Sequence, residues 1–305
     1  MARAASLLLA CLALAGCGLG PGKERSGGAE LRVTRDFGQR QLGSASARKV
    51  REGQTVMRLL RSHFDVDTRY GGRFVQAIRG VTGKGQSGRR DWFFFVNGSE
   101  APVGAAEYEL SPGDVVQWDY RRWDVAMRVP AIVGAFPEPF RHGLRGKRRP
   151  VRVECENASA APCKEAKARL RGRGIEAAGS SLGTSGTRKV IRVVVAKWPR
   201  ARTVSGAALL EREPSRSGVF ARFTNGGLQL LSEDGRLARV AAPGTGLVAA
   251  LAPSQDELVW LVTARDDRGL LAAARALDAR DLRNAYAVAA TSARSEKLPL
   301  AGPSR

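Results

Sequence analysis

The chain has 305 residues and carries 50 Lys and Arg side chains against 29 Asp and Glu, a formal net charge of +21 at neutral pH. Nucleic acid is the usual partner of so basic a chain. The N-terminus indicates that the chain is exported, which excludes nucleic acid as the partner. We therefore expect the basic chain to be attracted to anionic lipid headgroups or wall polymers. No later segment approaches the roughly 20 apolar residues that a transmembrane helix needs, which excludes a membrane-spanning protein.

The N-terminus is typical of an exported lipoprotein. Arg3 precedes the apolar stretch 7–14, and Leu14-Ala15-Gly16-Cys17 follows it. This pattern resembles the lipobox of bacterial lipoproteins, in which the Cys becomes the lipidated first residue; an ordinary secretory peptide that contains Cys17 is the alternative. We expect a signal peptide over 1–17 and a flexible tether over 18–30. The mature protein is then extracytoplasmic and anchored to the bacterial cell membrane through lipid on Cys17.

Two cysteines remain once Cys11 has left with the signal peptide and Cys17 carries lipid. They are Cys155 and Cys163. Outside the cytoplasm such a close pair favours a disulfide over a metal site, which would need further ligands at spacings that the sequence does not show. We therefore expect a Cys155–Cys163 disulfide and no metal site.

Residues 31–127 are predicted to form one compact α+β domain. Residues 30–37 alternate like a half-buried strand, and a second strand is expected near 47–51. Thr55 suits the N-cap of a helix that follows. The apolar face of that helix is formed by Val56, Leu59, Leu60 and Phe64, and further strands are expected over 66–70, 74–78 and 115–123.

The stretch Asp91-Trp92-Phe93-Phe94-Phe95-Val96-Asn97-Gly98 is the densest aromatic run in a chain with only 6% aromatic residues. Large apolar side chains followed by Asn-Gly predict the most buried strand of the domain, running into a hairpin. The last strand places Trp123 on its more polar face, where it is expected to be either edge cover or a contact surface. The two faces of that strand are Val116, Trp118 and Tyr120 on one side, and Gln117, Asp119 and Trp123 on the other.

Taken in order, several segments resemble the transcobalamin C-terminal-like domain, whose bacterial members are largely uncharacterised. The resemblance covers about residues 31–124 and implies a β-grasp-like α+β fold. In the animal carriers this domain closes over cobalamin against a large helical barrel, which nothing here resembles. The resemblance therefore implies a contact surface, formed by Trp92, the turn Asn97-Gly98 and Trp123, rather than a particular ligand. The segments that carry it are Gly53-Gln54-Thr55-Val56, Phe74-Val75-Gln76-Ala77-Ile78-Arg79-Gly80-Val81, Trp92-Phe93-Phe94-Phe95-Val96-Asn97-Gly98 and Tyr108-Glu109-Leu110-Ser111-Pro112-Gly113-Asp114-Val115-Val116.

Residues 128–150 are expected to form a Pro- and Arg-rich linker that is extended in part. Its basic cluster, Arg145-Gly146-Lys147-Arg148-Arg149, is interpreted as a solvated surface, with electrostatic membrane contact as the alternative. Residues 151–290 alternate strand and helix patterns and are predicted to form a second domain of α/β type and unknown function. Residues 291–305 are expected to be a disordered tail.

Catalytic motifs are absent from the sequence. There is no G-x-S-x-G elbow, no H-E-x-x-H and no P-loop, and the two His residues fall in no motif. We predict no catalytic residues, no enzyme and no required cofactor. The leading hypothesis is a lipid-anchored binding protein, with cobalamin or a related small molecule as the candidate ligand. The alternative is a structural or protein-interaction lipoprotein that binds another envelope protein and no small molecule.

Overall fold

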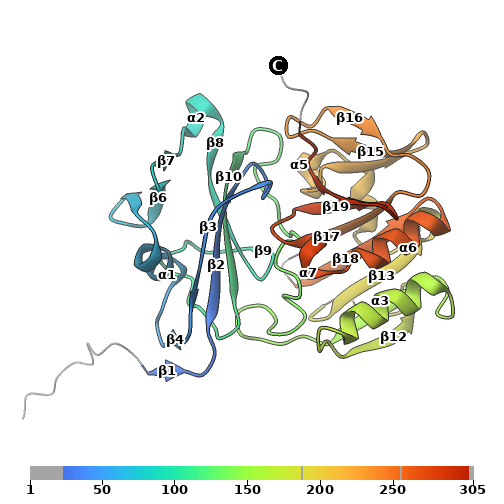
Figure 1. Cartoon of the computed structure of the whole chain (residues 1–305), viewed down its shortest axis with the longest axis horizontal. Coiled ribbons are helices and arrows are strands. Elements are labelled where there is room, and N and C mark those ends of the chain that lie inside the picture. Colours follow the sequence, from blue (N-terminus) through green and yellow to red (C-terminus); the bar gives the residue numbers. More distant parts are fainter. Residues whose placement is uncertain (1–22, 187, 255, 302–305) are drawn as a thin grey trace, which may run out of the picture.

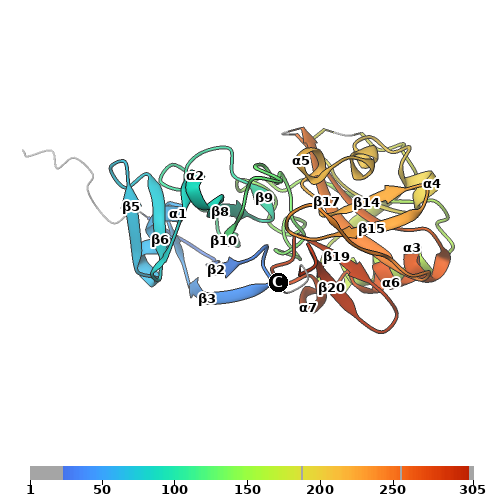
Figure 2. The ribbon, with the colours of Figure 1, turned by 90° about the horizontal axis from the view of Figure 1, so that it is seen from above.

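The computed structural model describes residues 23–186, 188–254 and 256–301. Two parts lie side by side: a sheet crossed by one helix, and a larger sheet with helices against it (Figure 1). Seen from above, the same two parts remain separate halves of the molecule (Figure 2). The chain is α+β, as predicted. Within the described ranges no helix has the length and apolar character to cross a membrane. The predicted signal peptide and Cys17 lie outside the described residues.

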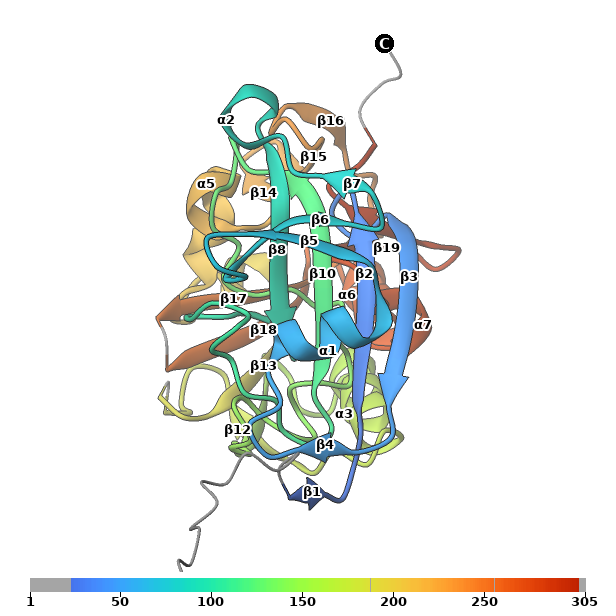
Figure 3. The ribbon, with the colours of Figure 1, turned by 90° about the vertical axis from the view of Figure 1, so that its left-hand side faces the viewer.

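The first part is built on a five-stranded sheet in the order β3-β2-β10-β8-β9. The central strands β2 (Ala29–Arg35) and β10 (Val115–Arg122) are parallel, and β10 pairs antiparallel with β8 (Arg90–Val96). Helix α1 (Val56–His63) crosses the sheet face that looks away from the second part (Figure 3). A hairpin, a crossing helix and a parallel central strand make this part β-grasp-like. Its other elements are β1 (Glu24–Arg25), β3 (Arg40–Ala47), β4 (Val50–Arg51), β5 (Val66–Arg69), β6 (Phe74–Ile78), β7 (Val81–Thr82), α2 (Gly85–Gly88) and β9 (Ser99–Glu100).

Helix α1 begins at the predicted N-cap. The Thr55 hydroxyl oxygen accepts a hydrogen bond from the Arg58 N–H at 3.3 Å, which satisfies a donor that the first turn leaves free. The apolar stripe of the helix then packs onto alternate residues of β2 and β10. The buried side chains on both sides of this contact are Val56, Met57, Leu59 and Leu60, and Leu31, Val33, Val116 and Trp118.

The aromatic strand β8 is covered on both faces. Trp92 and Phe94 pack into the core under α1, as strand alternation requires. Phe95 points the other way, into a smaller core between the two parts. Phe93 shares that second face, where the Arg121 guanidinium lies 3.8 Å from its ring centroid. The strand is therefore mostly a packing element, but the prediction that it is the most buried strand of the domain is wrong. Phe93 and Phe94 are only half-buried, whereas β10 is buried from Val115 to Arg121 because both of its neighbours are long strands.

The second part is a seven-stranded sheet in the order β12-β11-β13-β18-β17-β19-β20. The pairs among its first four strands are parallel, and the remaining pairs are antiparallel. Its central strands are buried on both faces, which explains their nearly continuous apolar sequences. The seven strands of the sheet, central and edge, are β11 (Val151–Cys155), β12 (Ala177–Ser181), β13 (Ile191–Lys197), β17 (Gly246–Ser254), β18 (Glu257–Ala264), β19 (Ala287–Ala290) and β20 (Ser295–Leu298).

Each face of this large sheet has its own core. Helices α3 (Ala161–Arg171) and α6 (Asp267–Arg275) cover one face. A three-stranded sheet and short helical turns cover the other. The second part is thus an α/β domain, in agreement with the prediction. Its remaining elements are α4 (Trp198–Ala201), η1 (Ala207–Glu211), α5 (Pro214–Ser217), β14 (Ala221–Thr224), β15 (Gly227–Leu231), β16 (Leu237–Val240) and α7 (Ala279–Leu282).

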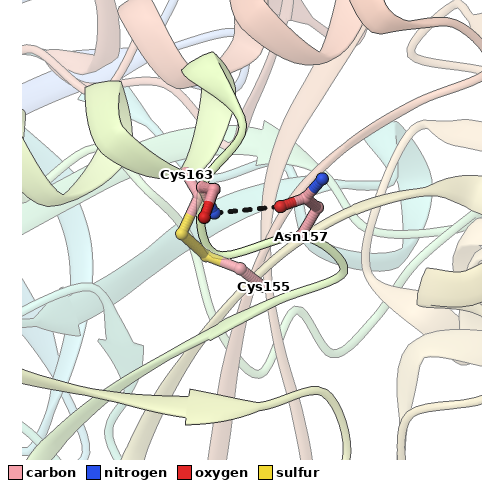
Figure 4. The surroundings of a disulfide bond; sticks show 4 residues. Cys155, Asn157 and Cys163 are labelled. Atoms are coloured by element: carbon pink, nitrogen blue, oxygen red, sulfur yellow. Dashed lines mark hydrogen bonds between the residues drawn. A yellow bond between two sulfur atoms is a disulfide. The ribbon is translucent and has the colours of Figure 1, made fainter.

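The predicted disulfide is present. Cys155 at the end of β11 is bonded to Cys163 in the first turn of α3. Between them, the Asn157 side-chain oxygen accepts a hydrogen bond from the Ser159 N–H at 2.9 Å, which shapes the connecting turn (Figure 4). The bond therefore joins a strand end to the helix that covers it, and a disulfide fits the predicted extracytoplasmic location.

The predicted linker is packed rather than extended. Phe136 and Phe140 are buried, and the ring centroids of Phe140 and Trp260 in β18 lie 4.8 Å apart. Val129 and Ile132 fill the smaller core between the two parts. Burial of these apolar side chains overrides the extended tendency of the prolines. We call residues 125–150 the connecting segment.

Two other boundaries differ from the sequence prediction. The tail predicted to be disordered over 291–305 contains β20, which pairs with β19 and buries Leu298 completely. Without β20, strand β19 would be a sheet edge with unpaired backbone groups. Within the predicted tether 18–30, β1 pairs with β4, and β2 already begins at Ala29. Residues 18–22 and 302–305 lie outside the described residues.

A polar face of the first sheet is buried against the second part. The Gln117 side-chain amide donates a hydrogen bond to the Asn284 carbonyl, and the Tyr286 hydroxyl donates one to Asp119 Oδ2, both at 3.0 Å. Burial raises the pKa of Asp119. This is the face on which the sequence predicts Gln117 and Asp119, and the second part covers it. Apolar side chains beside these contacts are Phe37, Phe95, Phe220 and Tyr286.

The variant Tyr286→Phe tests this contact. We expect the free energy of unfolding to fall by about 1–3 kcal/mol, because the buried Asp119 oxygen loses its donor. Urea unfolding followed by Trp fluorescence measures the change. Tyr70→Phe removes a hydroxyl from a side chain that is 79% exposed and serves as the control, with an expected effect within about 0.5 kcal/mol. Equal effects of the two variants would contradict a stabilising role for the contact.

Candidate ligand-binding groove

A groove of about 860 Å³ lies between the two parts, at the end of β8. The first part contributes residues 99–102, the connecting segment contributes residues 144–150 apart from Gly146, and the second part contributes the end of β17 and the start of β18. Small-molecule pockets have volumes of about 300–1,000 Å³ and occur preferentially at domain interfaces. A smaller hollow of about 420 Å³ is lined by Leu209, Arg212 and Arg216, and Arg216 also lines the groove.

The Asn97-Gly98 turn holds one wall of this groove in place. Asn97 has φ of 53°, a left-handed conformation that Asn tolerates better than most residues. Its side-chain amide donates hydrogen bonds to Asp114 Oδ1 and to the Gly143 carbonyl, both at 2.8 Å. Its side-chain oxygen accepts one from the Val115 N–H at 2.8 Å. Asn97 therefore ties the hairpin, the last strand and the connecting segment together.

Gly98 permits the connecting segment to approach the hairpin closely. A Cβ at this position would lie 2.6 Å from the Ile132 carbonyl oxygen. The Ile132 N–H instead donates a hydrogen bond to the Gly98 carbonyl at 2.7 Å. The residues on either side of the turn, Val96 and Ser99, line the groove. The turn thus positions the groove wall.

The four residues predicted to contact a ligand lie at opposite ends of β8. Asn97 is fully buried, and its turn adjoins the groove. Trp92 is 6% exposed, and its indole N–H donates to the Val81 carbonyl at 2.9 Å. Trp123 is half-buried, and its backbone N–H donates a hydrogen bond to the carbonyl of Arg89, the residue before β8. The structure brings only the turn to the groove, and ligand contact by Trp92, Asn97, Gly98 and Trp123 stays a prediction.

The basic cluster of the connecting segment forms the rim of the groove. Leu144 and Lys147 exchange two backbone hydrogen bonds of 3.1 and 3.0 Å across a tight turn. The two central residues, Arg145 and Gly146, both have left-handed φ, as in a type I′ turn. Arg145, Lys147 and Arg148 are exposed and line the groove. The cluster that the sequence marks as a solvated surface is thus held at a concave site.

Acidic side chains in the groove are each paired with an arginine. Glu100 lies 3.0 Å from Arg128, and Asp256 lies 3.9 Å from Arg149. Glu257 lies 3.5 Å from Arg192, which is itself buried. Other cations of the lining form no ion pair within the described residues, so the groove is electropositive. These cations are Arg145, Lys147, Arg148, Lys189 and Arg216.

A buried polar cluster lies behind the rim. Asp114 accepts hydrogen bonds from the Ser111 N–H at 2.7 Å and from Asn97. The pKa of Asp114 is raised to about 6, chiefly by burial and also by the nearby Glu138 charge, while the hydrogen bonds from Ser111 and Asn97 oppose the shift. Glu138 in turn lies 2.7 Å from His142 Nδ1. The cluster carries titratable groups at the junction of the hairpin and the connecting segment.

Comparison with known proteins finds one family model that is similar to part of the chain. The family described as "Domain of unknown function (DUF4430)" matches residues 53–122, within the first part. No curated protein matches the chain. Among solved structures, a candidate metal binding protein from Ruminococcus gnavus is similar over 32% of this chain and 97% of that one, with 14% identity and a TM-score of 0.25. A likeness at that TM-score carries no functional argument. In the part of this chain that the structure describes, no three or more His, Cys, Asp or Glu side chains are grouped to hold a metal ion.

Only part of the groove could be found from the sequence. The cluster 145–149 is visible as a run of basic residues. Lys189 and Arg216 come from distant segments, and no local pattern marks them as neighbours of the cluster. Their place in the lining follows from the docking of the two parts.

The variant Asn97→Gly separates the side chain of Asn97 from its backbone conformation. Gly keeps the left-handed φ but removes the three hydrogen bonds, so we expect a loss of at least about 2 kcal/mol in the free energy of unfolding. The control is Asn225→Gly, at an exposed Asn-Gly turn between β14 and β15, which is expected to change stability by less than about 0.5 kcal/mol. Chemical denaturation measures the free energy of unfolding of both variants. An Asn97→Gly variant as stable as the wild-type protein would refute the structural role of the Asn97 side chain.

The raised pKa of Asp114 predicts a pH dependence of stability. The unfolded chain ionises this carboxyl near its ordinary pKa of 3.8, whereas burial keeps it protonated up to about pH 6. Stability from this group is thus present at about pH 4 and is lost as the pH rises through about 6. Relative to Asp114→Asn, the wild-type protein should lose up to about 3 kcal/mol over that range. Unfolding free energies measured from about pH 4 to 7 test this. The exposed Asp65→Asn is the control, and a pH-independent difference for Asp114→Asn would contradict the prediction.

Proposed function

We propose that the protein is a lipid-anchored, extracytoplasmic binding protein whose small-molecule ligand occupies the groove between its two parts. The observation that supports this most directly is the groove itself, which both parts and the connecting segment line with apolar and charged side chains. Pockets of this size at a domain interface are the usual sites of ligand binding. We propose binding rather than catalysis, since the sequence carries no catalytic motif.

The anchor and the location are supported by the sequence. Leu14-Ala15-Gly16-Cys17 resembles a lipobox, and the Cys155–Cys163 disulfide suits an oxidising compartment. Lipid on Cys17 would hold the folded residues close to the membrane surface. The ligand would then be captured outside the cytoplasm.

A corrinoid is the first candidate ligand. Its support is the resemblance of residues 31–124 to the transcobalamin C-terminal-like domain, a region that contains the matched domain of unknown function. In the animal carriers, cobalamin lies between this domain and another. The groove here also lies between the β-grasp-like part and a second domain, although that domain is α/β rather than a helical barrel.

Titration with cobalamin and cobinamide tests this proposal. We use the chain from residue 18 onward, made without lipid, because it contains both parts of the fold. Isothermal calorimetry should show saturable binding with a Kd below about 1 mM, the weak end of the usual range. Ser254→Trp places a bulky side chain at an exposed groove position and should weaken binding at least about tenfold; Ser46→Trp, exposed on β3, should not.

The outcomes separate the versions of the proposal. Binding that Ser254→Trp leaves unchanged would remove the groove as the site. Absence of saturable heat with both corrinoids would remove them as ligands. The protein-interaction alternative then becomes the leading hypothesis only if no other small molecule binds either.

A further inference from the structure

We propose that the groove recognises phosphate, so that its ligand is a small organic phosphate bound by the basic turn of the connecting segment. This inference rests on the proposed function, because it concerns the same groove. It deepens that function by giving the chemical class of the ligand. Three properties of the groove carry it: uncompensated charge, a preformed rim and an apolar floor.

The positive charge of the groove favours a ligand that carries more than one negative charge. Its three acidic side chains each have an arginine partner, while Arg145, Lys147, Arg148, Lys189 and Arg216 form no ion pair within the described ranges. Five cations gathered at one concavity repel one another until an anion neutralises them. A phosphate ester carries up to two negative charges and three acceptor oxygens, which matches several convergent cations better than one carboxylate does.

The rim is held in shape without a ligand. The Leu144–Lys147 turn is closed by two backbone hydrogen bonds. Gly146 packs so closely on the first part that a Cβ there would lie 2.6 Å from Ser111 Oγ. At the far end of the cluster, the Arg149 guanidinium donates to the Asp256 carbonyl at 3.0 Å. Because the backbone that carries Arg145, Lys147 and Arg148 is already fixed, less ordering entropy is lost when they bind an anion.

The floor of the groove is apolar. Val96 and Leu258 are buried, and Pro130 and Ala252 line the groove beside them. A free inorganic ion would contact only the rim and leave this surface open to water. The combination therefore fits a ligand with an apolar body and at least one phosphate group.

Pyrophosphate is the probe of the rim. Isothermal calorimetry at constant ionic strength compares the protein with the triple variant Arg145→Gln, Lys147→Gln, Arg148→Gln. The matched control is Arg61→Gln, Lys164→Gln, Arg171→Gln, which removes three exposed cations that lie outside the groove. We expect saturable binding that weakens at least about tenfold in the groove variant and changes less than about threefold in the control. Circular dichroism confirms that both variants are folded.

Two further measurements identify the source of the phosphate. Citrate at equal charge should bind more weakly than pyrophosphate. Sedimentation with phosphatidylglycerol vesicles should be affected equally by the two triple variants. Vesicle binding lost selectively in the groove variant would overturn the proposal in favour of a lipid headgroup. Equal loss of pyrophosphate binding in both triple variants, no saturable binding, or tighter binding of citrate would also overturn it.

These results are independent of the corrinoid titration. Pyrophosphate binding without corrinoid binding would support phosphate recognition and remove only the corrinoid. Corrinoid binding that Ser254→Trp weakens, without pyrophosphate binding, would retain the groove and refute this inference.

Discussion

The buried polar face of the first sheet is the constraint on which the rest of the structure depends. A face that carries Gln117, Asp119 and Arg121 cannot be covered by an apolar layer without leaving polar groups unpaired. The Asn284 carbonyl accepts a hydrogen bond from the Gln117 amide, and the Tyr286 hydroxyl donates one to Asp119. Gln117 Oε1 and Arg121 Nε have no hydrogen-bond partner among the described residues. Arg121 donates to three backbone carbonyls, those of residues 122, 126 and 127. The contacts of Gln117 and Asp119 join the two parts and favour the observed arrangement.

The groove is a consequence of that arrangement. Once the polar face is covered, the connecting segment must pass the end of β8, where Asn97 and Gly98 hold it by hydrogen bonds and close packing. The segment then presents its basic turn opposite the start of β18. Charge that is spread along the sequence thereby gathers at one concavity. This arrangement connects the high net charge of the chain with its proposed binding role.

Local sequence patterns predicted the elements well where a single physical rule decides. Alternation placed Val116 and Trp118 on the core face of β10, and Thr55 marked the start of α1. The short spacing of Cys155 and Cys163 predicted their bond. The same patterns gave wrong predictions for the connecting segment and the tail. Phe136 is buried against Trp260, which is more than 100 residues away in the sequence. Leu298 is buried because its strand pairs with β19, which would otherwise be an open sheet edge.

The sequence by itself determined the α+β fold class, the start of helix α1 and the disulfide, which follow from periodicity, capping and spacing within short windows. The β-grasp-like order of the first part was what the resemblance to the transcobalamin C-terminal-like domain implied. Only the tertiary structure decided that the second sheet face is an interface, that Trp92 and Trp123 lie away from the groove, and that the basic run is its rim. Those features depend on which distant segments come into contact, and both apolar burial and a few hydrogen bonds between the two parts favour that arrangement.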